Sequence, residues 1–265
     1  GARDYLVPSR VHPGSFYALP QSPQIFKQLL MCSGYDRYFQ IARCFRDEDL
    51  RADRQPEFTQ VDMELSFVDV DDVIEVNERL IQYVCKEAIG LDVQLPIPRI
   101  TWQEAMDRFG SDKPDTRFGM ELQNVSDVVA GCGFGVFTSA LQAGGSVRAI
   151  TAKNAFNVLT RKEVDKLTEE ARGIGAKGLA WARIAEDGTV ASSFAKFMTE
   201  DEMNAIKEKC GAENGDVILI VADRKDLTLS VLGSLRQIVA RKLGIIPEDK
   251  YNLLWVVEFP FFDWD

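Results

Sequence analysis

Two runs of residues with a two-residue period, 37–45 and 57–67, flank a short charged segment. Alternation of apolar and polar side chains is typical of a strand with one buried face. Odd positions hold mainly Phe39, Ile41, Phe45, Val61, Met63, Leu65 and Phe67, and even positions hold Tyr38, Gln40, Phe58, Gln60, Asp62 and Glu64. We therefore predict two strands with a core face at the odd positions and hydrogen-bonding groups at the even ones.

The segment CFRDEDLRADRQPEFTQ, residues 44–60, joins these runs and carries charges of both signs. If the runs pair as antiparallel strands, the even positions share a face. This face would then carry the side chains of Arg46, Phe58, Gln60, Asp62 and Glu64. A guanidinium fork suits a phosphate, a ring suits a base, and carboxylates suit an amine or a metal. The pattern alone also fits a salt-bridged hairpin with a solvated loop.

The composition is that of an ordinary globular chain of 265 residues, with 46% hydrophobic and 27% charged residues. This length allows about two domains. There is no apolar run long enough to cross a bilayer and no signal-peptide pattern at residues 1–10. We expect a cytoplasmic protein without membrane contact.

The five cysteines are spaced without any CxxC pair, and His12 is the only histidine. A disulfide framework, a zinc site and a histidine-based catalytic triad are therefore disfavoured. The net charge of −10 is unevenly spread. Residues 1–60 carry eight Lys or Arg and seven Asp or Glu, a balance of +1, so the remainder carries −11. Any contact with nucleic-acid phosphates should lie in the first part.

A helix is predicted after residue 22, where Ser22 can cap it, Pro23 can occupy its first position and Gly34 follows its end. Gln24 and Lys27 lie three residues apart and share a face. An amide and an ammonium suit a carboxylate ligand, although a Gln and a Lys on a helix also commonly face solvent.

From about residue 120 the predicted strands and helices alternate, which indicates a separate α/β unit. The capping pairs Thr160 with Glu163 and Thr199 with Glu202 predict two of its helices. The stretch GCGFGVF, residues 131–137, has the wrong spacing for a dinucleotide fingerprint. We predict a turn that enters a strand there.

Several strings resemble one family in the right order. FRDEDLRADRQPEFTQVDME is similar to motif 2 of class II aminoacyl-tRNA synthetases, in the form typical of bacterial-type aspartyl-tRNA synthetases. The strings GARDYLVPSR and YALPQSPQIFKQLL resemble the amino-acid-binding segments of that family. The strings FGSDKPDTRF and LLWVVEFPFFDWD resemble segments that come later in the sequences of that family.

The resemblance implies an α+β fold, in which part of an antiparallel-sheet catalytic domain carries an inserted α/β domain. It implies three segments: a partial catalytic domain at 1–115, an insertion of the GAD type at 116–245, and a return to the catalytic domain at 246–265. A homodimer is expected for the full-length enzyme.

The implied activity is ATP-dependent activation of L-aspartate to aspartyl-adenylate, followed by transfer to tRNA(Asp). Arg46 is the expected catalytic residue, because charge grows on the phosphate oxygens. The implied ATP contacts are Arg46, Asp47, Glu48, Gln55, Phe58 and Gln60. The implied aspartate contacts are Ser22, Gln24, Lys27, Arg46 and Asp62. The implied tRNA contacts are Arg51 and Arg54.

Motifs 1 and 3 of the family lie outside this sequence, so we expect the chain to lack aminoacylation activity alone. We expect Mg²⁺ as a cofactor with ligands mainly outside the chain, and no metal site within it. Two other interpretations stay open. The chain could serve as a binding module through its inserted domain, or it could belong to a related class II ligase for asparagine or lysine.

Overall fold

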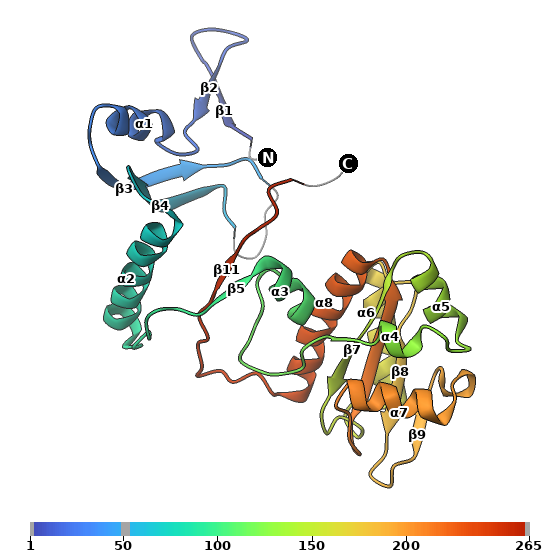
Figure 1. The fold of residues 1–265 in the computed structure, drawn as a ribbon. Helices are drawn as coiled ribbons and strands as arrows, with labels where there is room; N and C mark the ends of the chain where they lie inside the picture. Colours follow the sequence, from blue (N-terminus) through green and yellow to red (C-terminus); the bar gives the residue numbers. More distant parts are fainter. Residues whose placement is uncertain (1–2, 49–53, 263–265) are drawn as a thin grey trace. The chain divides into compact units, whose positions relative to one another are not determined.

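The computed structural model describes residues 3–48 and 54–262, and the chain divides into two compact units, Gly1–Pro96 and Ile97–Asp265. The first unit contains β1 (Tyr5–Pro8), β2 (Phe16–Leu19), α1 (Gln24–Cys32), β3 (Arg37–Phe45), β4 (Glu57–Leu65) and α2 (Val70–Ile89) (Figure 1). The pairs β1–β2 and β3–β4 are both antiparallel. The mixed α+β class with antiparallel sheet is therefore confirmed.

The register of β3 and β4 confirms the predicted sharing of faces. Gln40 lies opposite Asp62, and Cys44 lies opposite Phe58. Directly opposed residues point to the same side of a sheet. The even positions of both strands therefore form one surface.

The prediction that the odd face is core is wrong for this unit. Phe39, Ile41 and Val61 are more than half exposed, whereas Ala42 and Asp62 on the even face are less than 9% exposed. The cause is α1, which packs on β3 and β4. Alternation predicts which side chains share a face, but neighbouring elements decide which face is covered.

The helix termini of the first unit agree partly with the sequence. The acidic cluster at the start of α2 forms a capping box, in which the Asp72 side chain accepts a hydrogen bond from Asp69 N at 2.9 Å. In contrast, the predicted cap by Ser22 is wrong. Pro23 occupies the N-cap position of α1, and no side chain caps this helix.

The second unit begins with β5 (Arg99–Thr101) and α3 (Trp102–Phe109), and β5 pairs in parallel with β11 (Trp255–Val257). Between them lies a five-stranded sheet of order β6-β7-β10-β8-β9. Its strands are β6 (Gln123–Asn124), β7 (Ser146–Ala152), β8 (Ala180–Ile184), β9 (Val190–Ser192) and β10 (Val217–Asp223). Every neighbouring pair in this sheet is antiparallel, although helices alternate with the strands.

Helices cover both faces of the five-stranded sheet (Figure 1). They are α4 (Ser126–Val129), α5 (Gly135–Gln142), α6 (Arg161–Ile174), α7 (Glu200–Lys209) and α8 (Lys225–Leu243), with a short 3₁₀ turn η1 (Ala195–Phe197). One apolar cluster includes residues of α6 and α8, and a second includes residues of α4, α5 and α7. The core of the second unit therefore has two layers, one on each side of the sheet.

The predicted strand at residues 131–137 is wrong, because α5 begins at Gly135. Gly131 and Gly133 precede it in a turn. The eight residues of α5 place Phe137 fully inside the apolar cluster. Tertiary packing of this aromatic face outweighs the low helix propensity of the glycines.

The helices α3 and α8 meet without intervening side chains. A Cβ on Gly110 would collide with the carbonyl oxygen of Leu229, and a Cβ on Gly233 would collide with the carbonyl oxygen of Gly110. Gly110 also has φ +67°, which L residues rarely adopt. This approach joins α3 closely to the helix that covers the five-stranded sheet.

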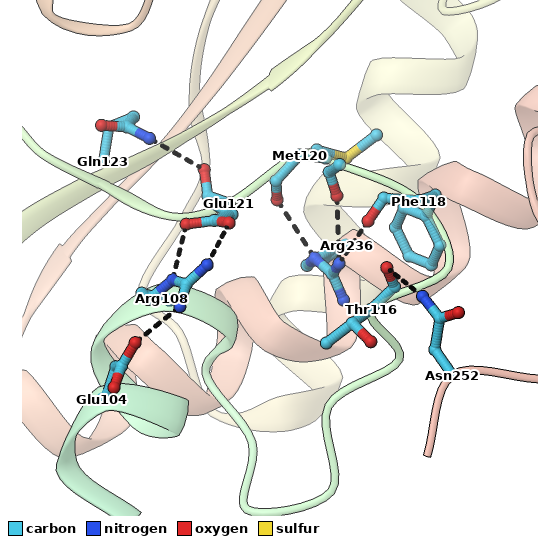
Figure 2. Close-up of polar contacts among 10 residues, drawn as sticks. Glu104, Arg108, Thr116, Phe118, Met120, Glu121, Gln123, Arg236 and Asn252 are labelled. Atoms are coloured by element: carbon cyan, nitrogen blue, oxygen red, sulfur yellow. Dashed lines mark hydrogen bonds and ion pairs between the residues drawn. The ribbon is translucent and has the colours of Figure 1, made fainter. Parts of the chain in front are cut away.

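Arg236 on α8 reinforces the same junction (Figure 2). It is 1% exposed and donates hydrogen bonds to the carbonyl oxygens of Phe118, Gly119 and Met120 at 3.0–3.1 Å. Its guanidinium also lies 4.1 Å from the ring centroid of Phe118. Burial lowers the pKa of this guanidinium. The segment between α3 and β6 is thus held by one buried cation.

The predicted segments 1–115, 116–245 and 246–265 stay a prediction. The contacts divide the chain after Pro96, and α3 packs on α8 within the second unit. In residues 3–48 and 54–262, no helix combines the length and apolar character that a membrane span needs.

Candidate functional site

Arg46 and Phe58 lie together at the end of the β3–β4 ribbon. The guanidinium carbon of Arg46 is 5.2 Å from the ring centroid of Phe58. Arg46 N donates to the carbonyl oxygen of Pro56 at 2.9 Å, which extends the ladder of the ribbon by one step. Arg46 Nε is buried and has no hydrogen-bond partner among the described residues. A buried donor without a partner is costly, so this end of the ribbon is suited to an anionic ligand.

A buried ion cluster lies farther along the same face. Lys27 of α1 is 7% exposed, and its Nζ lies 2.8 Å from Asp62 Oδ1 and 3.5 Å from Glu64 Oε2. The hydrogen bond with Asp62 raises the pKa of Lys27, although burial opposes this. Lys27 therefore stays charged in a site that largely excludes water.

One carboxylate oxygen of Asp62 accepts no hydrogen bond from the described residues. Its Oδ1 accepts from Lys27, whereas its Oδ2 is buried and accepts no hydrogen bond from the described residues. A lysine ammonium has three N–H donors, and Asp62 and Glu64 account for two of them. One donor is therefore available to a ligand. The cluster can therefore both accept from an ammonium and donate to a carboxylate.

Cys44 and Glu64 belong to this site, but the sequence analysis assigned neither of them a contact. Cys44 is fully buried, and its Sγ lies 3.2 Å from Gln60 Oε1. Burial raises the pKa of the Cys44 thiol, so it stays protonated and donates to Gln60. The even-position pattern that selected Gln60 and Asp62 also contains Cys44, and this was the available signal.

Ser22 and Gln24 line a hollow of about 740 Å³ beside the start of α1. Gln40 and Ala42 of β3 form another part of its wall. Because Gln40 lies opposite Asp62, the hollow borders the same even face. The five predicted aspartate contacts therefore lie on α1, on the segment before it and on the β3–β4 ribbon.

The described residues of the loop make contacts within the first unit, and their ligand contacts stay a prediction. Arg54 Nη1 lies 2.9 Å from Glu48 Oε2, so these two side chains neutralise one another. Asp47 N donates to the carbonyl oxygen of Arg3 at 3.0 Å, which ties the loop to the start of β1. Gln55 is exposed. Arg51, a predicted tRNA contact, lies outside the described residues.

Within residues 3–48 and 54–262, no three His, Cys, Asp or Glu side chains come together as a metal site would require. The acidic side chains of the candidate site are arranged around Lys27 instead.

Comparison with known proteins identifies the family. The family model for tRNA synthetases class II (D, K and N) matches residues 1–263. The chain belongs to this family. The described ribbon with Arg46 and Phe58 therefore lies in a class II tRNA synthetase, as the resemblance of residues 45–64 predicted.

Two curated relatives match the whole length of this chain. The chain is 66% identical over 264 residues to an aspartate–tRNA ligase from Agathobacter rectalis, and it is equally similar to an aspartate–tRNA(Asp/Asn) ligase from Lachnoclostridium phytofermentans. Both alignments cover 100% of this chain and 44% of the relative. The chain thus spans less than half the length of these class II synthetases. Relatives with either tRNA specificity are equally similar to it.

Among solved structures, an asparaginyl-tRNA synthetase from Pyrococcus horikoshii complexed with asparaginyl-adenylate gives a TM-score of 0.35 at 14% identity. This alignment covers 92% of the chain and 57% of that structure. The similarity is too weak to support structural inference.

Proposed function

We propose that the chain carries the amino-acid and ATP sites of an aspartate–tRNA ligase. This enzyme would activate L-aspartate with ATP to aspartyl-adenylate and transfer the aspartyl group to tRNA(Asp). The observation that supports it best is the common face of the β3–β4 ribbon. That face carries Arg46 with Phe58 at one end and the Lys27–Asp62 pair farther along.

The guanidinium of Arg46 would contact the α-phosphate of ATP, where negative charge grows as the substrate carboxylate attacks. A fixed cation aimed at that oxygen stabilises the transition state by electrostatics and positioning. The buried Nε without a partner supports this role. Arg46 lies over one face of Phe58, so adenine would stack on the other face or displace the guanidinium.

The Lys27 ammonium would bind the side-chain carboxylate of L-aspartate. Asp62 and Glu64 fix its position and favour its charged form. The unpartnered Asp62 Oδ2 would accept from the substrate ammonium. Ser22 and Gln24 would complete the pocket from the wall of the adjacent hollow.

The nucleotide contacts of Asp47, Glu48, Gln55 and Gln60 belong to the same proposal. Glu48 would exchange its ion pair with Arg54 for the ligand, and this exchange would free Arg54 to contact tRNA. Arg51 is proposed for the same tRNA contact on the resemblance alone. A homodimer and a cytoplasmic location are expected for the full-length enzyme.

Mg²⁺ is expected to accompany ATP, and the described acidic residues do not provide a ligand cluster for it. The ligands would lie mainly outside this chain. The roles proposed for Arg46, Phe58, Lys27 and Asp62 concern the substrates directly.

Amino-acid-dependent ATP–pyrophosphate exchange tests the proposal. A full-length protein that carries this chain should exchange with L-aspartate and much less with L-asparagine or L-lysine. Lys27→Gln should raise the KM for aspartate, because the amide cannot replace a buried ammonium opposite a carboxylate. Preference for asparagine or lysine would reject the aspartate assignment.

The 265-residue chain itself should show no exchange. Measurable aspartate-dependent exchange by this chain alone would contradict that expectation.

A further inference from the structure

A groove of about 690 Å³ lies on the five-stranded sheet beside α5. Helix α5 contributes the small residues Ser139 and Ala140, and Ala143 follows directly after it. The sheet side also has small residues, with Gly178 just before β8 and Ala222 near the end of β10. Small residues on both sides keep the space between helix and sheet open. Its volume falls within the range of about 300–1,000 Å³ that is common for small-molecule sites.

The interior of the groove is apolar. Phe134 and Val136 line it from the start of α5, and Ala180 and Ile220 line it from the sheet. Val136 is 55% exposed, so the groove opens to solvent at the helix. An aliphatic or aromatic group would remove this surface from water at a gain of about 25 cal/mol per Å².

A buried carboxylate stands at one end of the groove. Asp223 ends β10, lines the groove and is 8% exposed. Its Oδ1 accepts from Arg224 N at 2.9 Å, whereas its Oδ2 is buried and accepts no hydrogen bond from the described residues. The nearest cation to this oxygen, Lys177 Nζ, lies 3.4 Å away, which is longer than the usual 2.7–2.9 Å of a charge-assisted hydrogen bond. The oxygen can therefore accept a closer N–H group.

Exposed cations surround that carboxylate. Lys177 Nζ lies 3.4 Å from Asp223 Oδ2, and the Lys177 side chain is 87% exposed and free to move aside. Arg224 also lines the groove, and its guanidinium contacts Asp226 at 3.1 Å. Helix α8 begins at Lys225, so the positive end of its dipole lies at the same place.

We propose that this groove binds a free α-amino acid with a large apolar side chain. Its ammonium would donate to Asp223 Oδ2 in place of Lys177. Its carboxylate would pair with Lys177 and Arg224, and its side chain would fill the space between α5 and the sheet. A zwitterion with an apolar tail matches all three features of the groove. The site is built entirely from the second unit and shares no residue with the β3–β4 face, so it is independent of the proposed aminoacylation.

Calorimetry on the 265-residue chain tests the chemistry of the ligand. The probes are L-phenylalanine, N-acetyl-L-phenylalanine and L-phenylalaninamide. We expect L-phenylalanine to bind and the other two to bind at least about tenfold more weakly, because each lacks one charged partner. Equal binding of the acetylated probe would reject the role of Asp223. Absence of binding by L-phenylalanine, L-leucine and L-tryptophan at millimolar concentration would reject the site.

Two variants locate the binding. Asp223→Asn keeps the shape and removes the charge, and Ser139→Phe fills the groove from an exposed position on α5. Each should weaken L-phenylalanine binding at least about tenfold. The matched controls, Asp201→Asn and Gln142→Phe, alter exposed residues that do not line the groove and should leave binding unchanged.

Ser139→Phe keeps the test decisive if Asp223→Asn unfolds the sheet. Undiminished binding by a folded Ser139→Phe protein would place the amino acid elsewhere and overturn the proposal. Thermal unfolding of each variant provides the check of folding.

Discussion

The β3–β4 ribbon of the first unit and the five-stranded sheet of the second unit are covered differently. In the first unit, the β3–β4 ribbon buries Lys27 and Asp62 and exposes Phe39 and Ile41. In the second unit, both faces of the five-stranded sheet are covered by apolar clusters. A two-stranded ribbon gives little stability alone, whereas five strands between helices form a core. Substrate chemistry is thus expected on the covered face of the ribbon, and most of the folding stability in the five-stranded sheet with its helices.

The largest effect is expected from Arg236→Ala in the second unit. It would leave three backbone carbonyl oxygens without their donor and open a cavity, at a cost of about 3 kcal/mol or more. Residues 1–96 contain no tryptophan, so urea unfolding followed by tryptophan fluorescence reports on the second unit.

The control for this prediction is Arg241→Ala, which removes an exposed arginine from the same helix. It should change the free energy of unfolding by no more than about 0.5 kcal/mol. An equal loss of unfolding free energy in the two variants would mean that the buried Arg236 guanidinium contributes no more to stability than the exposed Arg241.

Arg46→Lys should have the next largest effect. It should lower the activity of the full-length protein and leave the stability of the fold nearly unchanged. A lysine cannot reproduce the guanidinium fork, so ATP–pyrophosphate exchange by the full-length protein should fall about 100-fold or more. Unfolding of the protein should be little changed, because Arg46 Nε has no partner to lose among the described residues.

Arg37→Lys is the matched control on the same strand. Arg37 lies on the exposed odd face and does not line the hollow beside α1. Exchange should stay near the parent rate. A similar loss in both variants would show that the ribbon responds to any change of arginine and would weaken the assignment of Arg46.

The smallest effect concerns the acid stability of the second unit. Lys166 and Lys242 lower the pKa of Glu163 from its ordinary 4.5 to about 2. A carboxyl with a lowered pKa stabilises the fold above its ordinary pKa, and this contribution is lost as the pH falls towards about 2. Glu163→Gln removes it, so the stability difference between parent and variant should shrink between pH 4.5 and pH 2.

Urea unfolding at several pH values measures this difference. Glu170→Gln, an exposed change on the same helix, serves as the control. A parent-to-variant difference for Glu163→Gln that does not vary with pH would contradict the proposed linkage.

Local signals in the sequence predicted much of the fold. The two-residue period predicted strands at 37–45 and 57–67, and the structure has them at Arg37–Phe45 and Glu57–Leu65. The shared even face followed from that period. The pair Thr199 and Glu202 predicted a capping box that the structure confirms. The resemblance of residues 45–64 to motif 2 predicted the family, and the family model confirms it over residues 1–263. These features depend on neighbours in sequence, so the sequence alone could supply them.

Predictions that depended on distant contacts were less successful. The covered face of the ribbon is set by α1, and the helix at residues 135–142 is stabilised by packing of Phe137 in a remote cluster. The Lys27–Asp62 ion pair joins residues 35 positions apart. Periodicity does not report which element packs on which face, so these contacts required coordinates.

The glycine contact between α3 and α8 has a mechanical consequence. Because backbone touches backbone at Gly110 and Gly233, there is no layer of side chains there to slide or repack. Torque applied to the five-stranded sheet would pass directly into α3 and onward to β5 and β11. A ligand that tilts that sheet would therefore also move the paired strands β5 and β11 of the same unit.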